Sequence, residues 1–137
     1  NVDKKNILLN DYIKNNDLEE NIILYGETKF PEKLINTFDI NIISSLSESS
    51  SLVLLETMSS GVASLATNVG PIKKTIGNAG WVVKKRSTRD LAEKLIFLIK
   101  NKTDIKAKSQ LARRRIMRKH SQDKMLKKYN LTYKLFL

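Results

Sequence analysis

Two glutamates eight positions apart are the residues of this sequence whose type and spacing best suit chemistry on a bound ligand. Glu48 follows a strand-like segment, and Glu56 stands about one and a half turns into the helix predicted by LVLLETMSS. Both carboxylates can therefore face one cleft. The serines between them are small, and free N–H groups where the helix starts suit a phosphate. The run predicts a diphosphate site, and the alternative is a serine-capped helix with two solvated glutamates.

The segments around this run alternate between strand-like and helical patterns. The apolar spacing, the β-rich runs and the positions of Gly, Pro and Ser set their limits. Strands are predicted at residues 21–26, 39–45, 62–67 and 81–83. Helices are predicted at 4–16, 32–37, 52–60 and 71–77, from a Ser87 cap to about Lys100, and in the basic stretch 104–137.

This alternation predicts an α/β fold. Parallel strands need long crossovers, and those crossovers cover both faces of the sheet with helices. Ligands of such sheets lie beyond the carboxyl ends of the strands. Residues 26–28, 46–51 and 68–71 occupy such positions, so we expect the ligand site to be built from them.

Composition excludes several classes of site. The 137 residues contain no cysteine and one histidine, His120, so thiolate chemistry and cysteine- or histidine-rich metal sites are excluded. We expect His120 to lie at the surface and no metal to be bound. The sequence shows neither a secretory signal nor an apolar run of about 18 residues. A net charge of +11 favours an anionic partner, with codon bias as the alternative explanation.

The run SLSESSSLVLLETMSSGVASLATNVG resembles the E-x7-E segment of retaining GT-B glycosyltransferases, whose usual form is PS-x-x-EGFGLVLLEAMA-x-G-x-PVVAT-x-x-G. NIILYG, FDINII, GNAGWVV and DLAEKLIFLI extend the match to about four-fifths of the chain. We identify the chain as similar to the C-terminal domain of a group 1, family 4-like member. The resemblance implies a Rossmann-like, three-layer α/β/α parallel sheet, the C-terminal half of a GT-B fold, with a basic C-terminal helical tail.

The resemblance also implies roles for individual residues. Glu48 matches the glutamate beside the transferred sugar, which gives it the catalytic position, and Glu56 matches the glutamate that binds the donor ribose. A carboxylate can accept two hydrogen bonds from a vicinal diol. The remaining matched positions contact the sugar and distal phosphate, or lie near the base: Ser49, Ser50, Ser51 and Leu52 for the first group, and Tyr25, Gly26 and Glu27 for the second.

Several positions depart from the family pattern. Ser50 stands where an aromatic residue is common, and Ser49 and Ser51 replace frequent glycines. Pro71 replaces a second glycine, and Lys74 replaces the usual glutamate. We expect Lys74 and its neighbouring lysine to be a solvated pair.

The domain prediction follows from the same resemblance. Residues 1–137 are expected to be a partial nucleotide-sugar donor-binding domain, with 104–137 as its last helices. The chain starts at Asn1 rather than Met, and we expect the first strand, its Arg and Lys phosphate loop and the N-terminal acceptor domain to lie outside it. The chain alone should then transfer no sugar.

The leading function is a hexosyltransferase-type glycosyltransferase (EC 2.4). The expected substrate is a nucleotide-sugar, in the first place a UDP-sugar, and no cofactor is expected. The acceptor would be a lipid-linked glycan in bacterial surface polysaccharide synthesis, such as lipopolysaccharide O-antigen, on the cytoplasmic side of the membrane. No nucleic acid is expected.

Two alternatives use other features. The charge and the run RRRIMRKH would suit a nucleic-acid-binding module, although aromatic residues are not interleaved with the basic cluster. A non-catalytic sugar-nucleotide-binding module would keep the fold without the reaction. The basic tail is either a solvated helix face or a peripheral contact with anionic lipid.

Overall fold

The computed structural model describes residue 3 and residues 5–136, which divide into two units, Asn1–Pro31 and Glu32–Leu137. In the first unit, α1 (Ile7–Asn15) starts at Asn6, whose side-chain oxygen accepts a hydrogen bond of 3.1 Å from the Leu9 N–H. Such a cap satisfies one of the free N–H groups of the first turn. The predicted helix from Lys4 to Asn16 is confirmed over α1, and Lys4 lies outside the described residues.

The predicted strand at residues 21–26 is wrong. These residues have no regular secondary structure, and the side chain of Ile23 is 81% exposed. A strand needs a neighbouring strand to receive its backbone hydrogen bonds. None of the described residues of this unit forms one, so the β-rich composition alone leaves the segment as extended coil.

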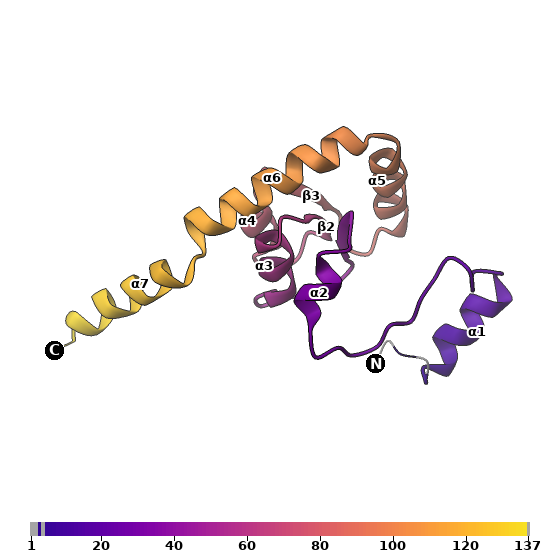
Figure 1. Cartoon of the computed structure of the whole chain (residues 1–137), viewed down its shortest axis with the longest axis horizontal. Coiled ribbons are helices and arrows are strands. Elements are labelled where there is room, and N and C mark those ends of the chain that lie inside the picture. The colour runs from indigo at the N-terminus through magenta and orange to yellow at the C-terminus, as the bar shows by residue number, and fades with distance from the viewer. Residues whose placement is uncertain (1–2, 4, 137) are drawn as a thin grey trace. The chain divides into compact units, whose positions relative to one another are not determined.

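In the second unit, three parallel strands form one sheet in the order β1 (Ile40–Ile43), β2 (Ala63–Thr67) and β3 (Gly80–Val83). Ile43 pairs with Ala66, and Ala66 with Val82. The crossovers contain α3 (Leu52–Ser59) and α4 (Ile72–Ile76). Figure 1 shows the other helices of this part of the chain, α2 (Pro31–Ile35), α5 (Thr88–Lys100), α6 (Lys102–Lys119) and α7 (Gln122–Lys134).

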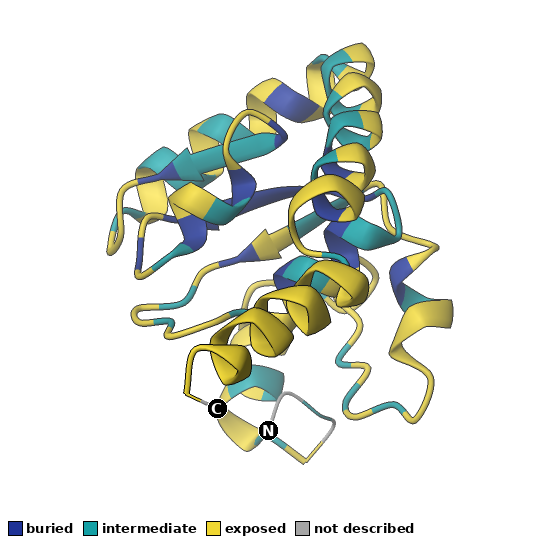
Figure 2. Cartoon of the chain, turned by 90° about the vertical axis from the view of Figure 1, so that its left-hand side faces the viewer, coloured by how far each residue is buried: buried dark blue, intermediate teal, exposed yellow. Residues whose placement is uncertain are grey.

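The core of this unit lies on both faces of the sheet. On one face, side chains of α3 and α4 pack against Ile43 and Ala66; on the other, Leu98 of α5 packs against Leu65 and Val83. All five residues of β2 are buried, as expected for a central strand covered on both sides (Figure 2). The predicted α/β/α fold is confirmed.

Helix α6 crosses the amino ends of the strands and joins the two halves of the core. Ile105 packs with the cluster around Leu98, whereas Ala112 and Ile116 belong to the cluster around α3 and α4. Between them, the Ser109 hydroxyl accepts a 3.1 Å hydrogen bond from the N–H of Ala63, where β2 begins. The first half of the predicted basic tail is therefore packed against the sheet.

Two arginines of this basic stretch bind the ends of other helices. Arg113 donates to the Ser59 carbonyl at the end of α3 (2.8 Å). Arg115 donates to the carbonyls of Lys74 and Thr75 in α4 at 2.7 and 2.6 Å. The last carbonyls of a helix lack intrahelical partners and carry partial negative charge, so cations stabilise them.

Candidate functional site

Glu48 lies in the loop that follows β1, at the carboxyl end of the sheet. Its carboxylate Oε1 accepts a hydrogen bond of 2.7 Å from the hydroxyl of Ser45, and the residue is half-buried. A hydrogen bond to an ionised acceptor is shorter and stronger than a neutral one. The Ser45 hydroxyl therefore restrains the carboxylate.

The same loop is fastened to the end of β2. Thr67, the last residue of that strand, is 4% exposed, and its hydroxyl lies 2.6 Å from the carbonyl oxygen of Ser45 and 3.4 Å from that of Ile43. The shorter contact is the stronger hydrogen bond. It holds the backbone of Ser45 against the sheet, three residues before Glu48.

Gly70 brings the loop after β2 against the backbone of Glu48. Its φ is +48°, and a Cβ atom at this position would overlap the carbonyl oxygen of Glu48. Only glycine combines this backbone conformation with such a close approach. The predicted site segments 46–51 and 68–71 are thus brought together.

The start of α3 is formed by Ser51, whose hydroxyl accepts a long 3.4 Å hydrogen bond from the N–H of Leu54. Among the described residues, no acceptor binds the N–H groups of Leu52 and Val53. The first turn carries no acidic residue that would offset the positive end of the helix. Ser49 and Ser50 are exposed just before it.

Glu56 is the fifth residue of α3, which starts at Leu52 as predicted, so it stands about one and a half turns into the helix. Its side chain is exposed. Because successive residues are rotated by about 100° around the helix axis, Glu56 projects between Leu52 and Val53, which are 67% and 54% exposed. Leu54 and Met58 bury the opposite side. Glu56 therefore stands on a solvent-facing surface that also presents apolar groups.

The helix ends as predicted at Gly61. Gly61 has φ +78°, its N–H donates to Met58, and the next N–H, that of Val62, donates to Thr57. This pair of hydrogen bonds is a Schellman motif, in which a left-handed residue satisfies the last carbonyls. It turns the chain directly into β2.

Three predicted donor-binding residues, Tyr25, Gly26 and Glu27, belong to the first unit. Gly26 has φ +78°, and Tyr25 is 60% exposed. A left-handed glycine after an extended segment fits a loop that turns sharply. Their contribution to a donor site remains a prediction.

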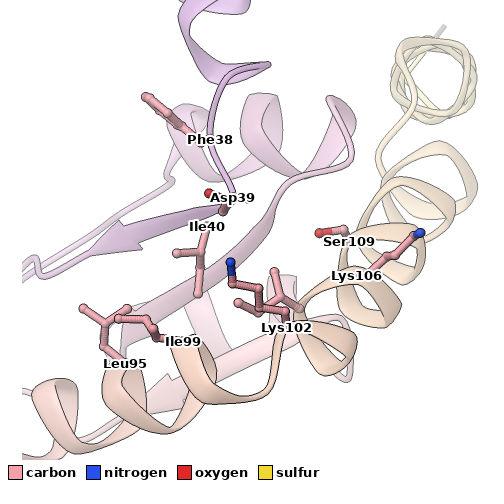
Figure 3. A pocket seen from close by; sticks show the side chains of 9 residues that line it. Phe38, Asp39, Ile40, Leu95, Ile99, Lys102, Lys106 and Ser109 are labelled. Atoms are coloured by element: carbon pink, nitrogen blue, oxygen red, sulfur yellow. The ribbon is translucent and has the colours of Figure 1, made fainter.

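A cavity of about 600 Å³ lies at the other end of the sheet (Figure 3). It is lined mainly by aliphatic side chains of β1, α5 and α6, with Lys102 and Lys106 at α6. None of the predicted site residues lines it. Ligands of parallel sheets bind at the carboxyl ends of strands, so this amino-end cavity is not the candidate donor site.

The described residues contain no group of three or more His, Cys, Asp or Glu side chains that could hold a metal ion. Within the same residues, no helix is long and apolar enough to cross a membrane. His120 is exposed at the junction of α6 and α7. Burial of part of its ring lowers its pKa, as do the positive charges of Arg115, Lys128 and Lys119.

Comparison with known proteins decides the family. The profile of the family described as Glycosyl transferases group 1 matches residues 4–120. The chain belongs to this family. The matched residues include the whole sheet and both predicted site glutamates.

Two curated relatives are similar over most of the chain. One is N-acetyl-alpha-D-glucosaminyl L-malate synthase of Bacillus anthracis, 28% identical over 123 residues, which are 88% of this chain and 32% of the relative. The other is poly(ribitol-phosphate) alpha-N-acetylglucosaminyltransferase of Staphylococcus aureus (strain COL), 28% identical over 120 residues, 85% and 24% of the two chains. The chain thus spans about a quarter to a third of these relatives.

Solved structures agree on the fold. Sucrose-phosphate synthase from Thermosynechococcus elongatus superposes with a TM-score of 0.85 at 17% identity, over 93% of this chain and 33% of that one. TarM superposes with a TM-score of 0.80 at 26% identity, over 89% and 25%. A variant of S. aureus TarM was solved with fondaparinux, alpha-GlcNAc-glycerol and UDP (TM-score 0.81, 26% identity, 89% and 25%). The predicted recognition as the C-terminal domain of a retaining GT-B glycosyltransferase is confirmed.

Sequence reasoning missed Ser45 and Thr67, and it did not foresee that Gly70, within the predicted segment 68–71, approaches Glu48. None is charged, and each acts on Glu48 or its loop through a contact made in the folded chain. One signal was present for Ser45, because a hydroxyl three residues before a carboxylate can reach it within a turn.

Proposed function

We propose that this chain binds UDP-N-acetylglucosamine as the donor part of a longer retaining glycosyltransferase. The observation that carries the proposal is the arrangement at the carboxyl end of β1, where Glu48 is restrained in the loop and Glu56 stands exposed on the first turns of α3. The names of both curated relatives contain an N-acetylglucosaminyl group, and a TarM variant was solved with UDP.

The proposed binding mode uses one end of α3 for phosphate and one side for ribose. The N–H groups of Leu52 and Val53, at the positive end of the helix, would donate hydrogen bonds to the diphosphate, with Ser49, Ser50 and Ser51 lining the approach. The Glu56 carboxylate would accept hydrogen bonds from the two ribose hydroxyls. Tyr25, Gly26 and Glu27 are proposed to lie near the base.

In the proposed reaction, Glu48 contacts the transferred sugar, and the diphosphate leaves toward the start of α3. Negative charge develops on that diphosphate as the glycosidic bond breaks, and preoriented N–H groups stabilise it without reorganisation. No protein nucleophile is assigned. The proposed acceptor is a lipid-linked glycan that takes part in bacterial surface polysaccharide synthesis. We propose that it binds to a part of the enzyme outside residues 1–137.

Helix α7 supports a further proposal about the acceptor side, namely peripheral contact with an anionic membrane. Four of its apolar side chains share one face at helical spacing, namely Met125, Leu126, Tyr129 and Tyr133. Lysines and uncharged polar residues make up most of the remainder, and none of its residues is buried (Figure 2). The rings of Tyr129 and Tyr133 stack with centroids 6.4 Å apart. Amphipathic basic helices of this kind bind at lipid headgroups.

The test of the donor proposal uses the longest natural polypeptide that contains this chain, together with residues 1–137 alone. The longer protein should release UDP from UDP-N-acetylglucosamine in the presence of a glycan acceptor, and should use UDP-glucose at least tenfold less well. Residues 1–137 alone should give no turnover. Equal use of both sugars would refute the assigned donor, and turnover by the short chain would refute its assignment as a donor-binding part only.

A further inference from the structure

We infer that Ser45 is a positioning residue for Glu48, and that Thr67 fixes Ser45 in the orientation this requires. The inference rests on the proposed role of Glu48 at the transferred sugar. It starts from the 2.7 Å hydrogen bond between the Ser45 hydroxyl and Oε1 of Glu48. The Ser45 side chain is itself half-buried, so the contact is partly shielded from water.

The loop that carries Glu48 has no helix or strand of its own. Residues 44–51 run from the end of β1 to the start of α3 without regular backbone hydrogen bonds. A carboxylate on such a segment would sample several rotamers, and binding a sugar would then cost side-chain entropy. Restraint from a neighbouring hydroxyl lowers that cost before the donor arrives.

The restraint is transmitted from the sheet. Thr67 is buried at the end of β2, and its hydroxyl binds the carbonyl of Ser45 at 2.6 Å. The position of Thr67 is set in turn by the register that pairs the preceding residue, Ala66, with Ile43. Ser45 is therefore held by a rigid strand, and a site supported by rigid elements keeps its geometry better than one built on a free loop.

The hydrogen bond also orients the carboxylate of Glu48 toward the ligand. Oε1 of Glu48 is occupied by the Ser45 hydroxyl, and Gly70 blocks movement of the Glu48 backbone toward the loop after β2. The remaining acceptor positions of the carboxylate are then held in a fixed orientation for the sugar hydroxyls. Removing the Ser45 hydroxyl should weaken recognition of the sugar and leave recognition of the nucleotide unchanged.

The experiment measures binding of UDP and of UDP-N-acetylglucosamine by calorimetry, in the longest natural polypeptide that contains this chain. Ser45→Ala should weaken UDP-N-acetylglucosamine roughly tenfold and leave the affinity for UDP unchanged. Ser45→Thr, which keeps a hydroxyl, should restore the affinity. Ser44→Ala, at the exposed neighbouring serine, serves as the matched control and should bind like the wild type. Thr67→Val should act in the same direction as Ser45→Ala, and Thr67→Ser should not.

A double variant separates positioning from general loop stabilisation. If Ser45 acts through Glu48, Ser45→Ala combined with Glu48→Gln should bind the sugar nucleotide no more weakly than Glu48→Gln alone. The inference is wrong if Glu48→Gln weakens UDP-N-acetylglucosamine but Ser45→Ala does not, or if Ser45→Ala weakens UDP equally. Absence of UDP binding by the wild type would instead refute the proposed function, and this inference with it.

Discussion

Gly70 lies so close to Glu48 that a Cβ atom at position 70 would overlap the carbonyl oxygen of the glutamate. The glycine belongs to the loop after β2 and the glutamate to the loop after β1, so the contact joins the carboxyl ends of two adjacent strands. Together with the Ser45 hydrogen bond, it leaves Glu48 little freedom in either its backbone or its side chain.

This contact predicts the effect of Gly70→Ala. The substitution must strain a backbone with φ +48° and displace the Glu48 carbonyl, so we expect a loss of about 2–4 kcal/mol in unfolding free energy. Gly61→Ala is the matched control, because Gly61 also has positive φ but the nearest atom to its Cβ would be 4.0 Å away. It should lose only about 1–2 kcal/mol. If urea denaturation shows the same loss of unfolding free energy for Gly70→Ala and Gly61→Ala, the contact between Gly70 and Glu48 is not tight.

Replacing Arg115, which lies far from the candidate site, should lower the unfolding free energy. Arg115→Met keeps the apolar stem but removes the hydrogen bonds to the carbonyls of Lys74 and Thr75, and should lower the unfolding free energy by about 1–3 kcal/mol. The exposed neighbour Arg114, changed to Met, should lower it by less than about 0.5 kcal/mol. If the denaturation curves of the two variants coincide, Arg115 does not stabilise the end of α4.

His120 predicts a dependence of stability on pH. Because its pKa is lowered in the folded chain, the unfolded chain takes up the proton first as the pH falls below the ordinary value of 6.5. The unfolding free energy should therefore be unaffected by this group above that pH and decrease below it, until the folded pKa is passed. His120→Gln should lack this part of the decrease between pH 7.5 and 5.0. A decrease of the same size in both proteins would exclude His120 as its source.

Helix α7 predicts binding to anionic vesicles. The wild type should sediment with vesicles of phosphatidylcholine and phosphatidylglycerol and not with phosphatidylcholine alone, and added salt should weaken the binding. Tyr129→Ser removes an exposed ring from the apolar face and should weaken binding about tenfold. Ile96→Ser, at an exposed apolar residue of α5, is the control. If Tyr129→Ser binds vesicles as the wild type does, α7 is not the contact.

The sequence predicted β2 and α3 closely, because the helix formers before Gly61 and the β-branched and small apolar residues after it carry strong local signals. It failed at residues 21–26, where composition favours a strand but pairing depends on a neighbour that local pattern does not reveal. The run RRRIMRKH suggested a nucleic-acid-binding module as an alternative function. In the structure Arg113 and Arg115 keep their charge but donate hydrogen bonds to backbone carbonyls, so these two residues of the run have a structural role.

At the candidate site, the sequence could place Glu48 and Glu56 because both belong to one continuous motif. It could not place Thr67 beside Ser45, or Gly70 beside Glu48, because these contacts depend on strand register and loop geometry. Side-chain hydrogen bonds between residues more than twenty positions apart leave no periodic signal along the chain.

Titration of UDP against Glu56 variants tests the central claim most directly. In the longest natural polypeptide that contains this chain, Glu56→Gln should weaken UDP binding at least tenfold, because it replaces a charged acceptor of two ribose hydroxyls with a neutral one. Glu93→Gln, at an exposed helical glutamate whose ion pair with Arg89 is solvated, should bind UDP as the wild type does. We predict that the wild type and Glu93→Gln bind UDP with the same affinity, and that Glu56→Gln binds it at least tenfold more weakly. Equal UDP affinity in Glu56→Gln and the wild type would contradict the assignment of α3 as the donor-binding helix.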